Sequence, residues 1–113
     1  MTKTREIYFF KGYFHAFFKT QPKKVKKKIL WTLRLITELE RIPEIYFKKI
    51  NGSNGLYEIR VQTGNNIYRI FCFFDRDNLV VVGNGFQKKS QRTPKSQIEK
   101  AEQIKREYEE EKK

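Results

Sequence analysis

Residues 56–86, LYEIRVQTGNNIYRIFCFFDRDNLVVVGNGF, decide the fold, because short turn-forming sequences separate three apolar stretches in them. The first stretch alternates apolar and polar side chains, the period of a strand with one buried face. The TGNN sequence at 63–66 suits a hairpin, since Gly and Asn tolerate positive φ. The second stretch, 67–74, is apolar on both faces except at Arg69, and the third, 79–86, is rich in β-branched residues. We therefore predict an antiparallel meander with 67–74 as its middle strand.

The N-terminal half carries the patterns of a further strand and two helices. The aromatic sequence REIYFF at 5–10 predicts a first strand, and Phe and Tyr at helical spacing after Gly12 predict a short helix. An apolar stripe after Pro22 predicts a second helix that Pro43 ends. A loop is expected over 46–55, before the meander.

A last helix is expected after the meander. Thr93 is placed to cap it and Pro94 to start it, and an apolar stripe follows. Its C-terminal turns are acidic, which opposes the helix dipole, so we expect them to fray.

These patterns predict an α+β fold. A chain of 113 residues is long enough for one core and too short for two of ordinary size. We expect a single domain over residues 1–113, in which a twisted antiparallel sheet contains the N-terminal strand and the meander. Two N-terminal helices and a C-terminal helix complete it.

The net charge of +12 indicates an anionic partner. Nucleic acid is the first candidate and an anionic membrane surface is the second. The membrane is disfavoured, because no apolar stretch approaches the roughly 20 residues that span a bilayer. The N-terminus does not resemble a secretory signal, and Cys72 is the only cysteine, so no intrachain disulfide can form. We expect a cytoplasmic protein.

Two arginines give the most specific physical indication of a site. Pairing around the 63–66 turn places Arg60 almost opposite Arg69, within the roughly 5 Å of cross-strand neighbours. Two guanidinium groups at that distance repel unless an anion lies between them. The anion can be a ligand, or it can be Glu58 in a buried salt bridge to Arg69, and both hold if Glu58 orients the arginine.

Basic and aromatic residues extend this surface. The loop at 84–94 carries Lys88, Lys89 and Arg92 without an acidic residue, so it is either a solvated connection or a contact to a polyanion. Phe71 and Phe86 flank the arginines and either stack on bases or belong to the core. Five lysines between positions 23 and 28 crowd the positive end of the predicted helix, as a solvated face or a phosphate-facing one.

Common catalytic motifs are absent from the sequence. It has no Gly-rich phosphate loop followed by Lys-Ser or Lys-Thr and no metal-type cluster of His and Cys. A Ser-His-Asp set is also missing, since the only histidine is His15. We therefore expect neither a metal nor a cofactor.

The segments GLYEIR, YRIFCFF and NGFQKKSQRTP, in this order and spacing, resemble the phage-derived, HigB-like branch of the RelE/ParE toxin superfamily. The resemblance covers nearly the whole chain. It implies a twisted antiparallel sheet with helices packed at its side. Most such proteins are ribosome-dependent mRNA endonucleases that a partner antitoxin neutralises, here implied to be a HigA-like helix-turn-helix protein.

The resemblance also implies site residues. The family's basic residue on the first meander strand falls on Arg60, its arginine on the second strand on Arg69, and its basic residue after the third on Lys88 or Lys89. Some relatives use a histidine or a terminal tyrosine near the last helix as acid or base, whereas this chain has Thr93 and Pro94 there.

We therefore expect metal-free cleavage of mRNA on the ribosome by attack of its own 2′-OH on the adjacent phosphate. Arg60 and Arg69 would clamp the phosphate, Lys88 would protonate the leaving oxygen, and Glu58 is a weaker candidate base. The basic faces at 23–28 and at Lys48 and Lys49 would contact ribosomal RNA. Two alternatives stay open, a ParE-like inhibitor of DNA gyrase and an RNA-binding module without catalysis.

Overall fold

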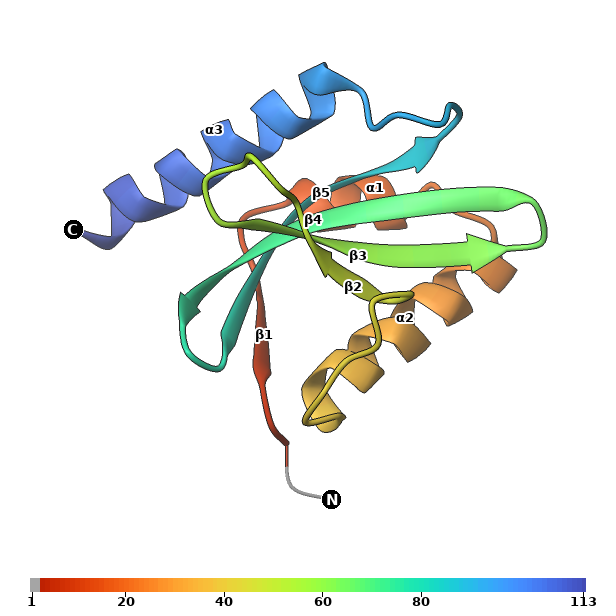
Figure 1. Ribbon diagram of the computed structural model, residues 1–113, viewed down its shortest axis with the longest axis horizontal. Coiled ribbons are helices and arrows are strands. Elements are labelled where there is room, and N and C mark those ends of the chain that lie inside the picture. Colours follow the sequence, from red (N-terminus) through yellow and green to blue (C-terminus); the bar gives the residue numbers. More distant parts are fainter. Residues whose placement is uncertain (1–2) are drawn as a thin grey trace.

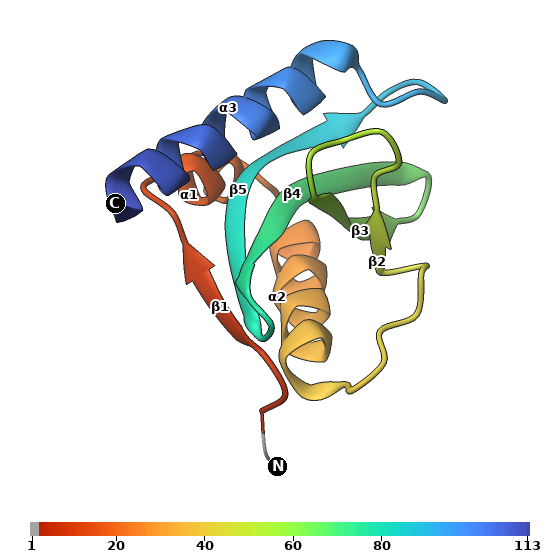
Figure 2. The ribbon, with the colours of Figure 1, turned by 60° about the vertical axis from the view of Figure 1, so that its left-hand side comes forward.

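The computed structural model describes residues 3–113 as a five-stranded sheet with helices on both faces (Figures 1 and 2). The elements are, in chain order, β1 (Glu6–Phe9), α1 (Tyr13–Phe18), α2 (Lys23–Glu38), β2 (Phe47–Lys49), β3 (Leu56–Thr63), β4 (Asn66–Arg76), β5 (Leu79–Lys88) and α3 (Lys95–Lys112). Figure 2 shows α2 on one face of the sheet and α3 on the other. The expected α+β class is confirmed.

The meander lies where the sequence predicts it. β4 pairs antiparallel with β3 on one side and β5 on the other, and the strand order is β1-β5-β4-β3-β2. The β3–β4 hairpin closes through a two-residue loop between Thr63 and Asn66, with Gly64 at a φ of 59° that L side chains rarely adopt. β4 is buried from Tyr68 to Phe73, as expected for a middle strand.

The sheet is mixed, so the prediction of a wholly antiparallel sheet is wrong at one edge. β1 pairs with β5 in parallel, from Glu6 opposite Leu79 to Phe9 opposite Val82. The aromatic composition of this segment favours a strand, but it contains no information on direction, which depends on the path of the chain through both N-terminal helices.

The expected loop at 46–55 also contains a strand. β2 pairs antiparallel with the first half of β3. With three residues, of which Lys48 and Lys49 are charged, it is too short to show an alternating pattern.

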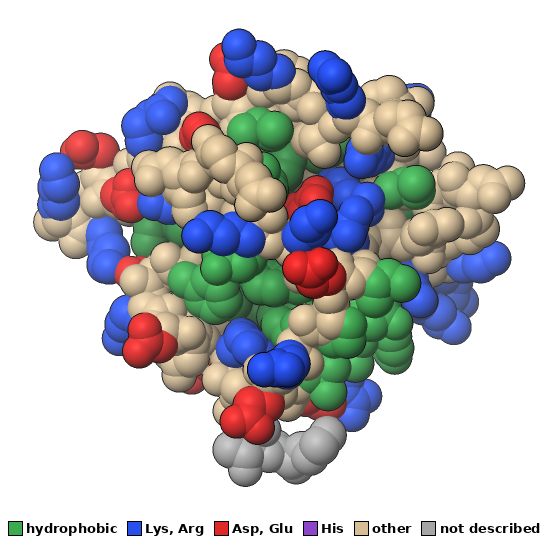
Figure 3. All heavy atoms as spheres, viewed as in Figure 1, with side chains coloured by type: hydrophobic (Ala, Val, Ile, Leu, Met, Phe, Trp, Pro, Cys, Tyr) green, Lys and Arg blue, Asp and Glu red, His purple; other side chains and the backbone are tan. Residues whose placement is uncertain are grey.

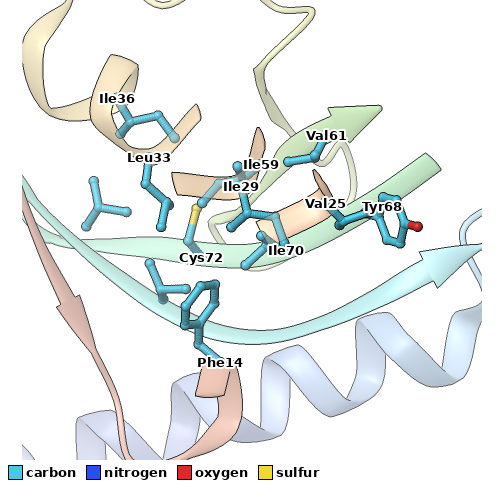
Figure 4. Close-up of a cluster of buried hydrophobic side chains, with 12 residues drawn as sticks. Phe14, Val25, Ile29, Leu33, Ile36, Ile59, Val61, Tyr68, Ile70 and Cys72 are labelled. Atoms are coloured by element: carbon cyan, nitrogen blue, oxygen red, sulfur yellow. The ribbon is translucent and has the colours of Figure 1, made fainter. Parts of the chain in front are cut away.

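α2 and α1 cover one face of the sheet. The predicted stripe on α2 is buried at Val25, Ile29, Leu33 and Ile36, and the helix ends at Glu38, before Pro43. Figure 4 shows these side chains meeting those of β3 and β4, with Cys72 among them. Among residues 3–113, no helix combines the length and hydrophobicity that crossing a membrane requires.

The close approach of α1 to the sheet depends on Gly85. A Cβ atom at this position would lie 2.6 Å from the ring of Phe17. Any side chain on Gly85 would therefore push the helix away from β5.

α3 packs on the opposite face and forms a second core cluster. Ala101 and Ile104 are buried against Leu56, Phe71 and other side chains of the sheet. The prediction that Thr93 caps this helix is wrong: Pro94 occupies the N-cap position, and no side chain makes a capping hydrogen bond.

The acidic end of α3 is held rather than frayed, so that expectation is also wrong. The helix continues to Lys112. The Tyr108 hydroxyl donates to Asp75 Oδ2 at 2.6 Å, and Lys11 Nζ lies 3.2 Å from Glu107 and 2.7 Å from Glu111. These partners come from distant segments, which helical periodicity does not reveal.

Candidate functional site

Arg60 and Arg69 lie directly opposite each other on β3 and β4, as the hairpin register predicts. Their side chains point to the face of the sheet that α3 covers in part. The Arg69 side chain is only 8% exposed and that of Arg60 is 29% exposed. Two guanidinium groups are thus held side by side and largely out of water, which is unfavourable without a counter-charge.

Glu58 supplies one counter-charge. Its carboxylate lies 3.3 Å from Arg69 Nε and 3.9 Å from Arg60 Nε, and its side chain is 14% exposed. The predicted salt bridge between Glu58 and Arg69 is therefore confirmed. One carboxylate faces two guanidinium groups, so the pair of arginines keeps an excess positive charge.

The guanidinium groups also keep unused donors. Arg69 Nη1 donates to the Tyr68 carbonyl at 3.2 Å, and Arg60 Nη1 donates to the Glu44 carbonyl at 3.3 Å. The Nε atoms of both arginines are buried and face the Glu58 carboxylate, but neither makes a hydrogen bond of good geometry to it. The pKa of Arg69 is lowered overall. Burial is the main cause and Arg60 adds to it, while Glu58 acts in the opposite direction. Two guanidinium groups that share one carboxylate keep an excess positive charge, which favours a second anion.

Lys88 joins the arginines at the end of β5. It pairs with Ile67, two residues from Arg69, so its side chain lies on the same face of the sheet. Burial lowers the pKa of Lys88, and Arg69 and Arg60 lower it further against the opposing effect of Glu58. We name Glu58, Arg60, Arg69 and Lys88 the arginine cluster. Figure 3 shows Lys, Arg and acidic side chains gathered in the middle of this face.

The remaining residues predicted for RNA contact divide into three groups. Phe71 is 1% exposed and packs under α3, so no base can stack on it and that prediction is wrong. Phe86 is half-buried beside it and lies opposite Arg69. The other residues are exposed, and they are Lys48, Lys49, Lys89 and Arg92. Lys48 lies opposite Glu58 and therefore on the face of the cluster.

Two hollows adjoin the arginine cluster. One of about 460 Å³ lies beside Arg60 and Arg69, and its other lining residues are Lys28, Ile45, Tyr46, Val61, Gln62 and Gly64. One of about 570 Å³ lies beside Lys88, and its lining residues include Lys89 and Gln87. The cluster thus borders open surface on two sides, which gives an extended anion room to pass across it.

Sequence reasoning missed Tyr46, and it assigned Lys28 to the basic face at 23–28 without placing it beside the arginines. Lys28 belongs to α2 and Tyr46 to the segment before β2, and no spacing in the sequence places these segments beside β3. The link is a backbone hydrogen bond in which the Arg60 N–H donates to the Tyr46 carbonyl at 2.8 Å. The helical spacing of Lys24, Lys28 and Trp31 is the one signal that indicates a shared basic and aromatic face.

Within the described part of the chain, no group of three or more His, Cys, Asp or Glu side chains is placed to hold a metal ion. Cys72 is buried, and burial raises the pKa of its thiol, so it is unsuited to act as a nucleophile.

A known protein family matches most of the chain, including the arginine cluster. The family model described as phage-derived protein Gp49-like (DUF891) matches residues 16–106. The matched range contains α2, the strands β2 to β5 and most of α3, and hence every member of the arginine cluster. No curated protein matches the chain significantly.

Proposed function

Since the chain belongs to the Gp49-like family, a RelE-like toxin family associated with toxin–antitoxin systems, we propose that it is a toxin that cleaves mRNA on the ribosome. This specific activity and its HigB-like character go beyond the family match. The chemistry of the arginine cluster supports the cleavage of mRNA, and the resemblance of the sequence segments supports the HigB-like character.

The observation that carries the proposal is the pair of largely buried guanidinium groups that share a single carboxylate. Arg60 and Arg69 face each other with only Glu58 between them. A phosphodiester that passes over them supplies the missing negative charge. Its charge increases in the transition state, so fixed donors bind the transition state more tightly than the substrate.

In the proposed reaction, the 2′-oxygen of a nucleotide attacks the adjacent phosphorus and the bond from phosphorus to the 5′-oxygen breaks. The 2′-OH proton goes to Glu58 or to water, and the leaving 5′-oxygen takes a proton from Lys88. The products are a 2′,3′-cyclic phosphate and a free 5′-OH. The lowered pKa of Lys88 suits it to this role, because a more acidic ammonium group is a better proton donor. The guanidinium groups stabilise the phosphate charge, so this reaction uses no metal or cofactor.

The proposed partners follow the distribution of charge. Lys48 on the face of the cluster, and Lys49, Lys89 and Arg92 around it, would contact mRNA or ribosomal RNA, with Phe86 beside Arg69. Such a protein would act in the cytoplasm. A HigA-like helix-turn-helix antitoxin would neutralise it.

The first test is a double substitution, Arg60→Ala with Arg69→Ala, in cells that express the protein. We expect growth inhibition to be lost, while Arg76→Ala, at an exposed position at the far end of β4, stays toxic. Lys88→Gln controls for unfolding, because it removes a repulsive charge, and it should be folded but strongly impaired in cleavage. Full toxicity of the double variant would rule out the phosphate clamp.

Mapping RNA 5′ ends after brief induction separates the candidate functions. New 5′-OH ends within translated mRNA support the nuclease. Intact mRNA with DNA-damage signalling would instead identify a gyrase inhibitor, and protected transcripts with unchanged ends would identify a non-catalytic RNA-binding module.

A further inference from the structure

An aromatic pair, of which Trp31 is exposed and Tyr46 is half-buried, lies next to the arginine cluster. Trp31 on α2 is 43% exposed, and its ring meets that of Tyr46 edge to face at 5.4 Å between centroids. Lys28 Nζ lies 4.5 Å from the centre of the Trp31 ring. An accessible tryptophan ring beside a lysine is a candidate for contact with a ligand that has both aromatic and anionic parts.

The aromatic pair is continuous with the arginine cluster. The hollow beside Arg60 and Arg69 shares Lys28 and Gln62 with a third hollow, of about 530 Å³, that Trp31 lines. Tyr46 connects the two hollows, because its ring contacts Trp31 and its backbone carbonyl accepts a hydrogen bond from the Arg60 N–H. Figure 3 shows a hydrophobic area directly beside the group of charged side chains. A ligand bound at the cluster therefore reaches the aromatic rings without leaving the surface.

The charges around the aromatic pair indicate which kind of ligand binds there. Lys24, Lys27 and Lys28 line the hollow beside Trp31, and among the described residues no Asp or Glu side chain lines that hollow or the one beside Arg60 and Arg69. Lysines that hold phosphates beside aromatic rings that hold bases are the arrangement by which proteins bind single-stranded nucleic acid. An apolar peptide would leave the three lysines without partners.

We infer that Trp31, Tyr46 and Lys28 form a base-stacking subsite for an unpaired nucleotide next to the phosphate at Arg60 and Arg69. This inference rests on the proposed function, whose RNA substrate it extends by one recognised base. Lys28 contacts the phosphate of that nucleotide, and the ring of Trp31 or Tyr46 covers the base.

Trp31 is the only tryptophan of the chain, so its fluorescence reports on the subsite directly. The experiment titrates the purified protein, without ribosomes, with a short single-stranded RNA and with an oligomer of equal length that lacks bases. Fluorescence quenching and the anisotropy of labelled oligomers are recorded for wild type, Trp31→Ala and Trp31→Phe. Leu30→Ala, exposed on another side of the same helix, is the matched control, and thermal unfolding verifies that each variant is folded.

We expect the RNA to quench Trp31 and Trp31→Ala to bind RNA about tenfold more weakly, with a much smaller loss in Trp31→Phe. Binding of the base-free oligomer should not change. Unchanged RNA affinity in Trp31→Ala, or equal losses for both oligomers, would overturn the subsite, as would equal quenching by heparin, a polyanion without bases. Normal stacking by a protein that leaves mRNA intact in cells would overturn the proposed nuclease instead.

Discussion

At the scale of single residues, the arginine cluster is electrostatically unbalanced. Three cationic side chains, Arg60, Arg69 and Lys88, share one carboxylate, Glu58, which leaves two positive charges in excess. Burial strengthens their mutual repulsion, because less water screens them. A bound phosphate relieves this repulsion. The protein should therefore be more stable with a bound phosphate than without one.

Glu58→Gln should expose this imbalance. Removing one partner of a largely buried ion pair leaves an uncompensated charge, and we expect the free energy of unfolding to fall by about 2 to 4 kcal/mol. Inorganic phosphate should raise the melting temperature of the variant more than that of wild type. Glu44→Gln is the control, since it removes the same charge from an exposed side chain. Equal stability of Glu58→Gln and wild type in low salt would contradict the role assigned to Glu58.

Lys88→Met should have the opposite effect on stability. Its pKa is lower in the folded protein than in the unfolded chain, so at neutral pH the charged lysine destabilises the native state. We expect a gain of about 0.5 to 1 kcal/mol. The gain should shrink as pH rises through the lowered pKa toward 10.5, because wild type then loses the charge as well. Denaturant unfolding of both proteins from neutral to alkaline pH measures it, and Lys89→Met, at an exposed position, should change little.

The position of the two arginines was predictable from the sequence, whereas the surroundings of the pair were predictable only in part. The turn at 63–66 sets the register, which places Arg60 opposite Arg69 whatever surrounds them. The burial of Phe71 was not predictable, because it depends on where α3 crosses the sheet. Tyr46 was missed for a related reason, since its position depends on the path of the chain between α2 and β3.

At the scale of elements, contacts between distant segments determine features that local sequence patterns do not predict. The meander follows from alternation and turn residues, and α2 follows from its apolar stripe. Local patterns do not predict the direction of β1 or the order of the acidic end of α3, because both depend on partners distant in sequence. Asp75 at the end of β4 is such a partner for Tyr108 and Lys112.

Asp75→Asn should therefore loosen the last turns of α3. The Lys112 and Tyr108 contacts lower the pKa of Asp75, so the carboxylate stabilises the folded state at any pH above its ordinary pKa of 3.8. We expect a loss of about 1 to 2 kcal/mol at neutral pH and faster amide hydrogen exchange in residues 105–112. The difference from wild type should disappear as pH falls through the lowered pKa, because Asp75 is then protonated in both states. Asp77→Asn, exposed in the next turn, should behave like wild type at every pH.

At the scale of the whole molecule, the net charge of +12 is unevenly distributed. The lysines that begin α2 lie on the face opposite α3, whose last turns are acidic (Figure 2). The lysines at 23, 24 and 27 are exposed and crowd the positive end of the α2 dipole, which is locally unfavourable. A phosphate backbone along this end of the helix would compensate for both effects.

Salt dependence tests whether these lysines touch phosphates or only add to the net charge. Binding to single-stranded RNA should weaken linearly on a log–log plot of affinity against salt, with a slope of roughly −0.7 per neutralised phosphate. Replacing Lys23, Lys24 and Lys27 by Gln should make the slope shallower by up to about 2, since three contacts are removed. The control replaces Lys100 and Arg106 on α3 and Lys113 directly after it by Gln, which changes the net charge equally and should leave the slope unchanged. Identical slopes in both triple variants would mean that the α2 lysines attract RNA at a distance without contacting it, and the binding path would then be confined to the arginine cluster and its immediate borders.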